Sequence, residues 1–281
     1  MKLFILQLRG ELRKLFARKR TYIGFGAFLL LELVVLGLMH MEKAERGIRR
    51  MIERAGYGFE DYFSGLTLAF IILKMTIFFL GGLYLALIAG DMVAKEVEDG
   101  TMRMTLCRPV SRWRLLAVKA AGCGIYTFAL VLFIGISALI AGLIDRGAGG
   151  LFAEDFVQGL FALYEFGPGL VRYLAALPLL GLSLLTVSAI GFMFSCFNMK
   201  PAAATILTLS ILFVDLILSA FPYFESFRPY FFSQRMGVWV DIFRTPIPVW
   251  QMVEDYVWLF AINATLLAIG MVSFQTRDFK S

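Results

Sequence analysis

Few residues of this chain belong to the types that carry out covalent chemistry. Its three cysteines, Cys107, Cys123 and Cys196, show neither a Cys-x-x-Cys pattern nor the spacing of a metal site, so we interpret them as small packing residues. His40 is the only histidine, which excludes most hydrolase mechanisms that use an imidazole as general base. No G-x-x-x-x-G-K-[ST] run occurs either, so the chain has no P-loop to hold ATP phosphates. These residue types predict a protein without a catalytic or metal site of its own.

Three charged residues stand inside long apolar runs, namely Glu32, Lys74 and Asp215. An ionised group at the centre of a bilayer costs about 2.5–3.5 kcal/mol on insertion scales, so such groups usually face protein or water. Counted from one side of the membrane, their depths differ by less than about 8 Å, at about 1.5 Å per residue. We therefore expect Lys74 to pair with Glu32 or Asp215 and to fix helix packing, with a place on a transport path as the alternative.

The apolar runs that contain these charges are long enough to cross a membrane. Of the 281 residues, 59% are hydrophobic and 17% are charged, whereas soluble domains are about 45–50% apolar and about 25% charged. Backbone groups in lipid must bond within their own helix, so residues 1–281 are predicted to form a single, all-α integral membrane domain. Six segments reach the length of about 17–25 residues that a spanning helix needs: about Thr21–Met39, Leu66–Ala89, Ala120–Ile144, Val171–Phe197, Ala202–Phe221 and Tyr256–Ser273. The first run is too long for a cleaved signal peptide, so we expect it to remain as a span.

Basic residues in the loops predict which side of the membrane each loop faces. Of the 27 lysines and arginines, 16 lie in segments on the side of both chain ends and 10 lie on the other side. The positive-inside rule then places both termini in the cytoplasm, in a multi-pass protein of the plasma (cytoplasmic) membrane. The net charge of +6 follows from this bias, and we expect no nucleic-acid partner. The loop after the first span is also basic, and we expect it to form a short helix outside.

Two further segments are expected to lie at the membrane surface. Residues 1–20 place apolar residues at helical spacing with basic residues between them, which predicts an amphipathic helix on the inner leaflet. Residues 222–255 are rich in aromatic residues and are interrupted by four prolines. Because Tyr and Trp favour the headgroup level, we expect this second segment to lie at the outer membrane surface, with an ordinary interfacial loop as one of the forms it can take.

One long polar interval with a recognisable pattern, residues 91–119, separates the second run from the third. Gly100 permits a sharp turn, and Thr101 can cap a helix that follows. The pair Arg108-Pro109 breaks or redirects the chain, and Ser111 can cap a further helix that continues into the third span. We predict a short cytoplasmic helix between the two spans, placed to transmit a push from a soluble partner to both.

This pattern resembles the first cytoplasmic loop of the exporter-class permeases of ABC transporters, the type-2 permease family. The likeness rests on Glu96, Gly100-Thr101, Leu106, Pro109-Val110-Ser111-Arg112, Leu116 and Lys119, and the six-span layout extends it to nearly the whole chain. In that family the loop contacts the ATPase subunit. The resemblance therefore implies a coupling helix and an ATPase-coupling loop made of Glu96, Gly100, Thr101, Arg103, Arg108, Pro109, Val110, Ser111, Arg112 and Lys119. It also implies short re-entrant or surface helices within residues 222–255.

The same resemblance implies the partners and the function. An ABC ATPase subunit on a separate chain would bind ATP and Mg, so no cofactor is expected on this chain. A second permease subunit, identical or different, would complete the pathway through the lipid bilayer. The predicted function is that of the membrane-spanning permease subunit of an exporter, which moves an unidentified substrate with ATP hydrolysis by its partner.

Two other classes of protein are alternatives to this prediction. An ATP-independent membrane channel or scaffold would bind no ATPase. A membrane enzyme, such as an intramembrane protease or a lipid transferase, would need a Ser/His pair, paired aspartates at helical spacing or a metal cluster, and we find none in the sequence. The composition fixes neither the substrate nor the direction of transport, and lipid, drug, peptide, polysaccharide and ion cargoes are all left open.

Overall fold

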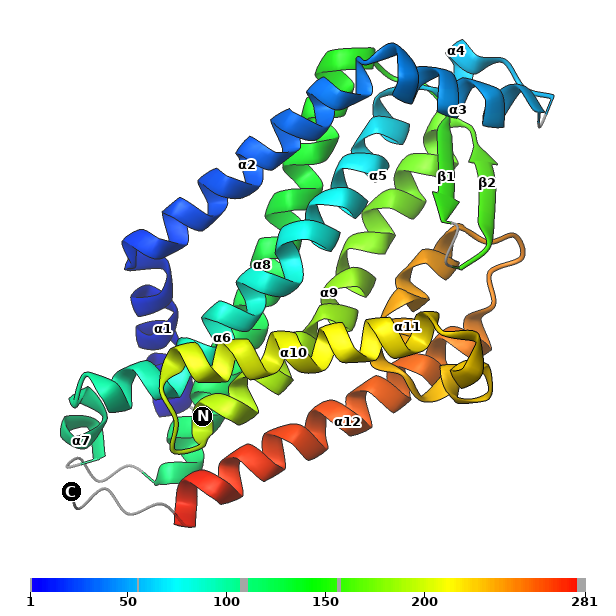
Figure 1. The fold of residues 1–281 in the computed structure, drawn as a ribbon. Helices are drawn as coiled ribbons and strands as arrows, with labels where there is room; N and C mark the ends of the chain where they lie inside the picture. Colours follow the sequence, from blue (N-terminus) through cyan, green and yellow to red (C-terminus); the bar gives the residue numbers. More distant parts are fainter. Residues whose placement is uncertain (1, 55, 107–110, 156–157, 277–281) are drawn as a thin grey trace.

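The computed structural model describes residues 2–54, 56–106, 111–155 and 158–276, and it confirms the six predicted spans within them (Figure 1). The second span consists of two α-helices joined by a π-helical turn, η1. In the described chain the only β-strands are the two of a small hairpin, and the protein is an all-α membrane protein. The spans are α2 (Lys19–Met39), α5 (Gly65–Thr76) with η1 (Ile77–Gly81) and α6 (Gly82–Glu98), α8 (Arg112–Arg146), α9 (Phe166–Cys196), α10 (Pro201–Ala220) and α12 (Val249–Thr276).

Four of the spans extend farther than their hydropathy predicted. The second span was expected to end at Ala89, but α6 continues to Glu98, and α8 already begins at Arg112. A helix does not stop where the hydrocarbon stops, because its hydrogen bonds are internal and Ala, Lys and Glu are good helix formers. Gly100 ends this run with a positive φ of 71°, a conformation that glycine adopts at little cost. The polar interval 91–119 is therefore largely a continuation of the two spans.

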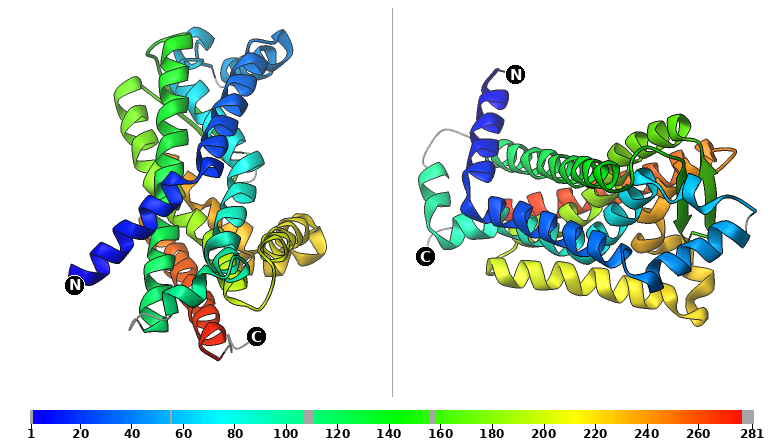
Figure 2. Two further views of the ribbon diagram at one scale, coloured as in Figure 1. Left: turned by 90° about the vertical axis from the view of Figure 1, so that its left-hand side faces the viewer. Right: turned by 90° about the horizontal axis from the view of Figure 1, so that it is seen from above.

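The spans pack as a tilted bundle in which the second span and α9 are central (Figures 1 and 2). Helix α5 contacts α2 and α8, whereas α6 contacts α9 and α10, and α12 packs on α9. The leading helix α1 (Lys2–Ala17), α7 (Thr101–Leu106) and the last turn of α12 lie at one end, which we call the terminal end. Helices α3 (Glu42–Arg54) and α4 (Phe59–Tyr62) lie with the hairpin at the opposite end, which we call the hairpin end.

The hairpin between α8 and α9 was not predicted from the sequence. Strands β1 (Leu151–Asp155) and β2 (Leu160–Tyr164) pair antiparallel, and Gly159 has a positive φ of 60° just before β2. Two short apolar runs with a glycine between them are a hairpin signal. A search for spans uses windows of about 19 residues, which is too long to register strands of this length.

Close backbone contacts fix the hairpin end. A Cβ atom built on Gly142 of α8 would lie only 2.2 Å from the Gly65 carbonyl oxygen of α5, so neither helix could approach this closely with a side chain there. The Thr67 hydroxyl of α5 accepts the main-chain N–H of Phe152 at 2.7 Å and thereby ties β1 to the same helix. Glycines permit such close contacts between membrane helices, and Gly142 has this role in the third span.

The length of β1 decides which residue of α5 its last side chain meets. Leu151 forms a bridge with Phe63, just before α5 begins. From Leu151 to Asp155 the strand advances about 13 Å, and from Gly65 to Lys74 the helix advances about 14 Å. The two elements lie side by side, so Asp155 reaches the level of Lys74.

Residues 222–255 fold as a series of short helices. These are η2 (Pro222–Tyr230), α11 (Phe232–Met236) and η3 (Gly237–Phe243), and α12 already begins at Val249. Trp239 and Phe243 are buried, and both rings pack on Phe70 of α5. The second half of the segment is therefore part of the core, whereas η2 in its first half is a helix without buried residues.

Candidate functional site

The leading helix α1 packs one side against α8. Leu15 is buried, whereas Ile5 and Leu6 are exposed, so only part of the apolar face lies inside the bundle and the rest is available to lipid. The Thr21 hydroxyl donates to the Leu15 carbonyl at 2.6 Å and fixes the corner between α1 and α2. The amphipathic helix predicted for residues 1–20 is present, and the structure adds that it is docked on the third span.

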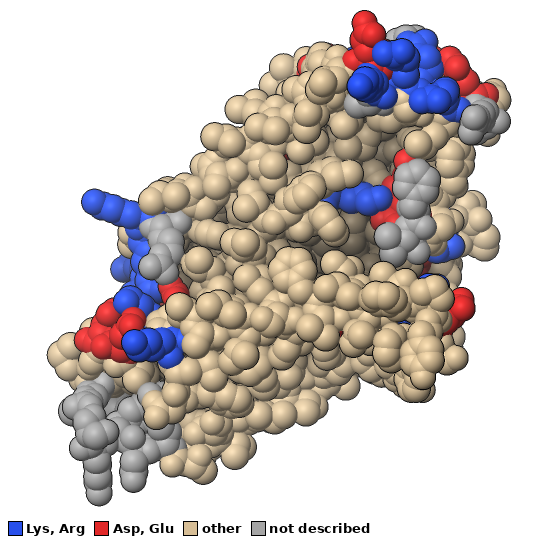
Figure 3. Space-filling model, in the orientation of Figure 1, with Lys and Arg blue, Asp and Glu red and all other residues tan. Residues whose placement is uncertain are grey.

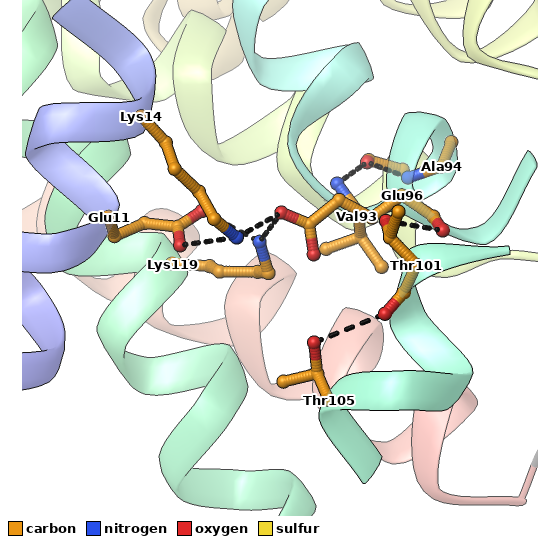
Figure 4. A network of polar contacts seen from close by, with 9 residues as sticks. Glu11, Lys14, Val93, Ala94, Glu96, Thr101, Thr105 and Lys119 are labelled. Carbon is orange, nitrogen blue, oxygen red and sulfur yellow. Dashed lines mark hydrogen bonds and ion pairs between the residues drawn. The ribbon is translucent and has the colours of Figure 1, made fainter. Parts of the chain in front are cut away.

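Four charged residues meet where α1, α6 and α8 come together (Figure 4). We call Glu11, Lys14, Glu96 and Lys119 the terminal cluster. The Lys119 Nζ lies 2.7 Å from Glu11 Oε1 and 2.8 Å from Glu96 Oε1. The Lys14 Nζ lies 3.2 Å from Glu96 Oε1 and 3.7 Å from Glu11 Oε2. Each carboxylate is shared by two ammonium groups, so the cluster carries no net charge while it joins three helices.

Burial gives this cluster a larger desolvation cost than a surface ion pair has. The Lys119 side chain is 0% exposed, and those of Glu11 and Glu96 are 10% and 7% exposed. Taking a charge out of water costs several kcal/mol per ion, and only close, well-directed partners offset that cost. Two partners within hydrogen-bond distance meet this requirement for Lys119. Loss of one buried member would leave the others uncompensated.

The short helix α7 is hydrogen-bonded to a residue of the same cluster. After the turn at Gly100, the Thr101 hydroxyl donates to the main-chain carbonyl of Glu96 at 3.2 Å. Thr101 was predicted to cap α7, but it is the first residue of that helix and instead satisfies a carbonyl that the end of α6 leaves open. Glu96 therefore holds α7 through its main chain and Lys119 through its side chain.

Helix α7 also forms a wall of a cleft that opens over the terminal cluster. The cleft has a volume of about 490 Å³ and is lined by residues of α1, α6, α7 and α8, including all four charged residues of the cluster. Met102 of α7 is buried, whereas Met104 is 67% exposed at the rim of the cleft. One side of α7 is thus anchored, and the other presents an apolar side chain to whatever approaches this end.

The other predicted coupling residues have different places. Ser111 occupies the N-cap position of α8, although its side chain makes no cap bond there. Arg112 donates from Nη1 to the Gln275 carbonyl of α12 at 2.9 Å and so links the third span to the sixth. Arg108, Pro109 and Val110 lie outside the residues that the structure describes, as does the side chain of Arg103.

Sequence reasoning missed the two members of the terminal cluster that lie on α1. Glu11 is the only acidic residue among the first 20, and a single carboxylate in a basic segment was the available signal. Lys14 follows it by three residues, which places both side chains on one face of a helix. The basic residues of an interfacial helix usually face lipid headgroups, but Lys14 contacts protein carboxylates instead.

The predicted pairing of Lys74 with Glu32 or Asp215 was wrong. The Lys74 Nζ lies 3.1 Å from Asp155 Oδ2 and donates to the Glu154 carbonyl at 3.0 Å. Asp155 is the last residue of β1, and the prediction failed because the sequence analysis did not include the hairpin that brings it there.

The two intramembrane carboxylates have other partners. Glu32 of α2 accepts the Ser137 hydroxyl of α8 at 2.8 Å. Asp215 of α10 accepts the main-chain N–H groups of Phe232 at 3.0 Å and Ser233 at 2.7 Å. Because the first N–H groups of a helix lack internal partners, Asp215 fastens the start of α11 to the fifth span. Both carboxylates therefore hold pairs of elements together.

Lys74 and Asp155 also line an apolar groove on the side of the bundle, which we call the lateral groove. It has a volume of about 370 Å³ and lies between η1, α6, α9, α10 and the η3 segment. On its walls Phe78 and Phe79 of η1 are 67% and 61% exposed, and Phe213 of α10 is 60% exposed. The groove thus combines an aromatic surface with a lysine and a carboxylate at one end.

The fold and the terminal cluster define a class of protein: a multi-pass membrane protein whose second and third spans continue beyond the bilayer to carry a braced, exposed helix. The chain belongs to the ABC-2 transporter family, because the model of the family described as "ABC-2 family transporter protein" matches residues 16–225. That match runs from the end of α1 into η2. The protein is accordingly a membrane component of an ABC-2 transporter, a family in which an ABC ATPase is the general partner.

A curated bacterial protein is also similar. The "Uncharacterized protein YhcI" of Bacillus subtilis (strain 168) is 28% identical over 147 residues, which make up 50% of this chain and 46% of the relative. The similarity thus spans about half the length of each protein, and the printed name of the relative states no activity.

Proposed function

We propose that this chain is the permease subunit of an ATP-driven exporter and that α7 is the point at which a separate ATPase subunit acts on it. The observation that carries the proposal is the double role of Glu96. Its carbonyl holds Thr101 of α7, and its carboxylate holds Lys119 of α8. Because the buried ions tolerate little separation, a force on α7 would move α6, α8 and α1 together.

The proposal gives each partner a place. The terminal end would face the cytoplasm at the plasma membrane, where the ATPase, with its ATP and Mg, would dock on α7 around the exposed Met104. Glu96 and Lys119 are buried, so they would transmit the stroke without touching the ATPase. Export, rather than import, is proposed on the likeness of the 91–119 loop alone.

The transport pathway would form on the face that carries the lateral groove. A second permease subunit, identical or related, would cover Phe78, Phe79 and Phe213, whose exposure forms a broad aromatic surface. The groove would then lie between two subunits, with Lys74 and Asp155 as its polar residues. The substrate would be bound there and released when the subunits change their relative position.

Co-purification tests the docking of the ATPase. The tagged chain would be isolated from its native membrane in mild detergent, and ATPase activity would be measured in the eluate. We expect a P-loop ATPase to accompany the wild type and to be reduced at least tenfold by Met104→Asp. Met41→Asp is the matched control, because Met41 is also exposed, at 54%, and lies at the hairpin end. A wild-type eluate without ATPase, from folded protein, would exclude this function and favour a channel or scaffold.

The orientation is tested by labelling with a membrane-impermeant maleimide in cells that produce a cysteine-free variant. We expect Tyr57→Cys, at the hairpin end, to react in intact cells. Met104→Cys should react only after the membrane is opened. The reverse pattern would place α7 outside the cell, where no ATPase could reach it.

A further inference from the structure

Helix α3 carries a row of basic residues at the end of the bundle opposite to the terminal cluster. Lys43, Arg46 and Arg50 are spaced three and four residues apart, so they follow one face of the helix. All three are exposed, while Ile52 on another face of α3 is buried in the core. In Figure 3 the blue side chains gather over α3, beside the hollowed surface below it. The positive-inside rule does not account for such a row at this end.

The three cations share a single hollow and have few ion-pair partners within the described chain. Lys43, Arg46 and Arg50 are the residues that line it. Within the described chain, only Arg46 has a carboxylate partner, Glu42 at 3.1 Å, and the two side chains are 64% and 88% exposed. An ion pair this exposed contributes little, so a ligand of greater charge can replace Glu42.

Arg49 lies between these residues in the sequence but is engaged differently. It pairs with Glu45 and Glu53, and its guanidinium lies 4.0 Å from the centre of the Phe59 ring. The contrast shows that α3 has one flank of satisfied charges, which attaches it to α4, and another flank on which cations converge without matching carboxylates.

A second, apolar pocket adjoins the basic hollow through Lys43, which lines both. This pocket has a volume of about 290 Å³ and lies between α3 and α5, with Gly47 and Met51 on one wall and Ile71 and Met75 on the other. Lys74 also reaches it. Glu154 of β1 is the acidic residue on its wall, and burial raises the pKa of that carboxyl above its ordinary value, against the opposing effect of Lys74.

We propose that this pair of cavities binds an anionic phospholipid of the leaflet at the hairpin end. The phosphate would lie among Lys43, Arg46 and Arg50, and an acyl chain would occupy the pocket between α3 and α5. Charge complementarity selects the headgroup, since basic residues near a membrane each contribute roughly fivefold to binding of anionic lipid. The adjoining apolar pocket favours a lipid over free phosphate, because a free phosphate would contact only the cations and would leave the pocket unused. The site shares Lys74 with the lateral groove but no residue with α7, and it does not depend on the transport function.

Lipid binding to the purified full-length protein tests the assignment. The protein in detergent would be titrated with dioleoyl phosphatidylglycerol or dioleoyl phosphatidylcholine, and bound lipid would be counted by native mass spectrometry. We expect the wild type to prefer phosphatidylglycerol and the triple variant K43Q/R46Q/R50Q to lose that preference. Arg50→Gln and the neighbouring Arg49→Gln form a matched pair. The first should weaken binding roughly fivefold and the second less than twofold, because only Arg50 faces the hollow.

A variant of the pocket separates a lipid from a free phosphate group. No atom lies within 4 Å of a Cβ built on Gly47, so Gly47→Leu fills the pocket without a clash at the backbone and improves the helix propensity of α3. We expect it to weaken binding of phosphatidylglycerol at least fivefold with an unchanged thermal transition. The proposal is overturned if the triple variant keeps the preference. It is also overturned if Gly47→Leu binds like the wild type while glycerol phosphate displaces the lipid, which would reveal an anion site only.

Discussion

The two ends of the bundle use a lysine–carboxylate pair in different ways. At the terminal end, Lys119 of a spanning helix meets Glu11 of a segment outside the spans, and at the hairpin end Lys74 meets Asp155. The Lys119 side chain is 0% exposed, whereas that of Lys74 is 28% exposed and borders the lateral groove. A lysine–carboxylate contact is therefore a structural joint where it is sealed from solvent, and it becomes part of a cavity wall where it is left open.

The hairpin end can leave its lysine open because other contacts hold it together. Gly65 and Gly142 bring two helices into backbone contact. The chain around β1 is attached to α5 because Thr67 accepts the Phe152 N–H and the Ser64 hydroxyl donates to the Gly150 carbonyl. Such contacts need no charge. The terminal end has no comparable backbone contact between α1 and α6 in the described chain, and there the buried ions connect the helices.

The largest effect is expected from Lys119→Met. The substitution leaves two carboxylates buried with only Lys14 to compensate them, and breaking a buried pair in this way costs about 3–5 kcal/mol. Thermal unfolding in detergent should show a large drop in Tm. Lys95→Met is the control, because Lys95 pairs with Glu98 and Asp99 at 37% exposure, where solvent screens an ion pair and Tm should change little. Equal Tm values for the two variants would show that the terminal cluster does not hold its three helices together.

Gly142→Ala tests whether the hairpin end depends on backbone contact. The added Cβ would overlap the Gly65 carbonyl oxygen, and overpacking of this kind costs about 1–3 kcal/mol or more. Gly37→Ala should be neutral or slightly stabilising, because nothing lies within 4 Å of a Cβ at Gly37 and alanine favours a helix. A Gly142→Ala protein as stable as the wild type would contradict the comparison of the two ends.

Lys74→Met gives the direct comparison with Lys119→Met. Because Lys74 is partly exposed and has one carboxylate partner, we expect a loss of about 1–2 kcal/mol, between the values for surface and buried pairs. Adding Asp155→Asn should restore part of the stability, since the double variant leaves no unpaired charge. A loss as large as that of Lys119→Met would mean that the Lys74–Asp155 pair also holds its elements together.

The smallest effect is expected from Thr101→Val. It removes the hydrogen bond from α7 to the Glu96 carbonyl, which is worth about 0.5–1.5 kcal/mol, and leaves the terminal cluster intact. Tm should change little, while ATPase activity in the co-purified complex should lose its dependence on this chain. If that dependence persists, α7 is held by Met102 and not through Glu96.

Features with a strong periodic or compositional signal were predictable from the sequence. The six spans, the amphipathic α1 and the helix between spans two and three follow from apolar length and turn residues. The hairpin was missed because ten paired residues fall below the window of a span. The partner of Lys74 was missed with it, since depth in the membrane restricts which residues can meet but does not identify segments that enter from outside.

The site was predictable in composition but not in arrangement. Glu96 and Lys119 were named from the loop pattern, yet that pattern assigned them to a contact with a partner, whereas both are buried. Burial depends on α1, which approaches from a distant part of the chain, and a pattern within the 91–119 loop carries no information about that approach. Lone residues of opposite charge, such as Glu11 in a basic helix, were the signal that could have revealed it.

The π-helical turn at Ile77–Gly81 determines how the side chains that follow it in the second span are rotated about the helix axis. One additional residue in a helical turn rotates the subsequent side chains by about 100° relative to an uninterrupted α-helix. Helix α5, before this shift, packs mainly on α8, whereas α6, after it, packs mainly on α9 and α10. Deleting a single residue there would turn Glu96 more than a quarter of a circle away from Lys119. The extra residue in the middle of the second span therefore determines whether Glu96, at the end of that span, can reach Lys119.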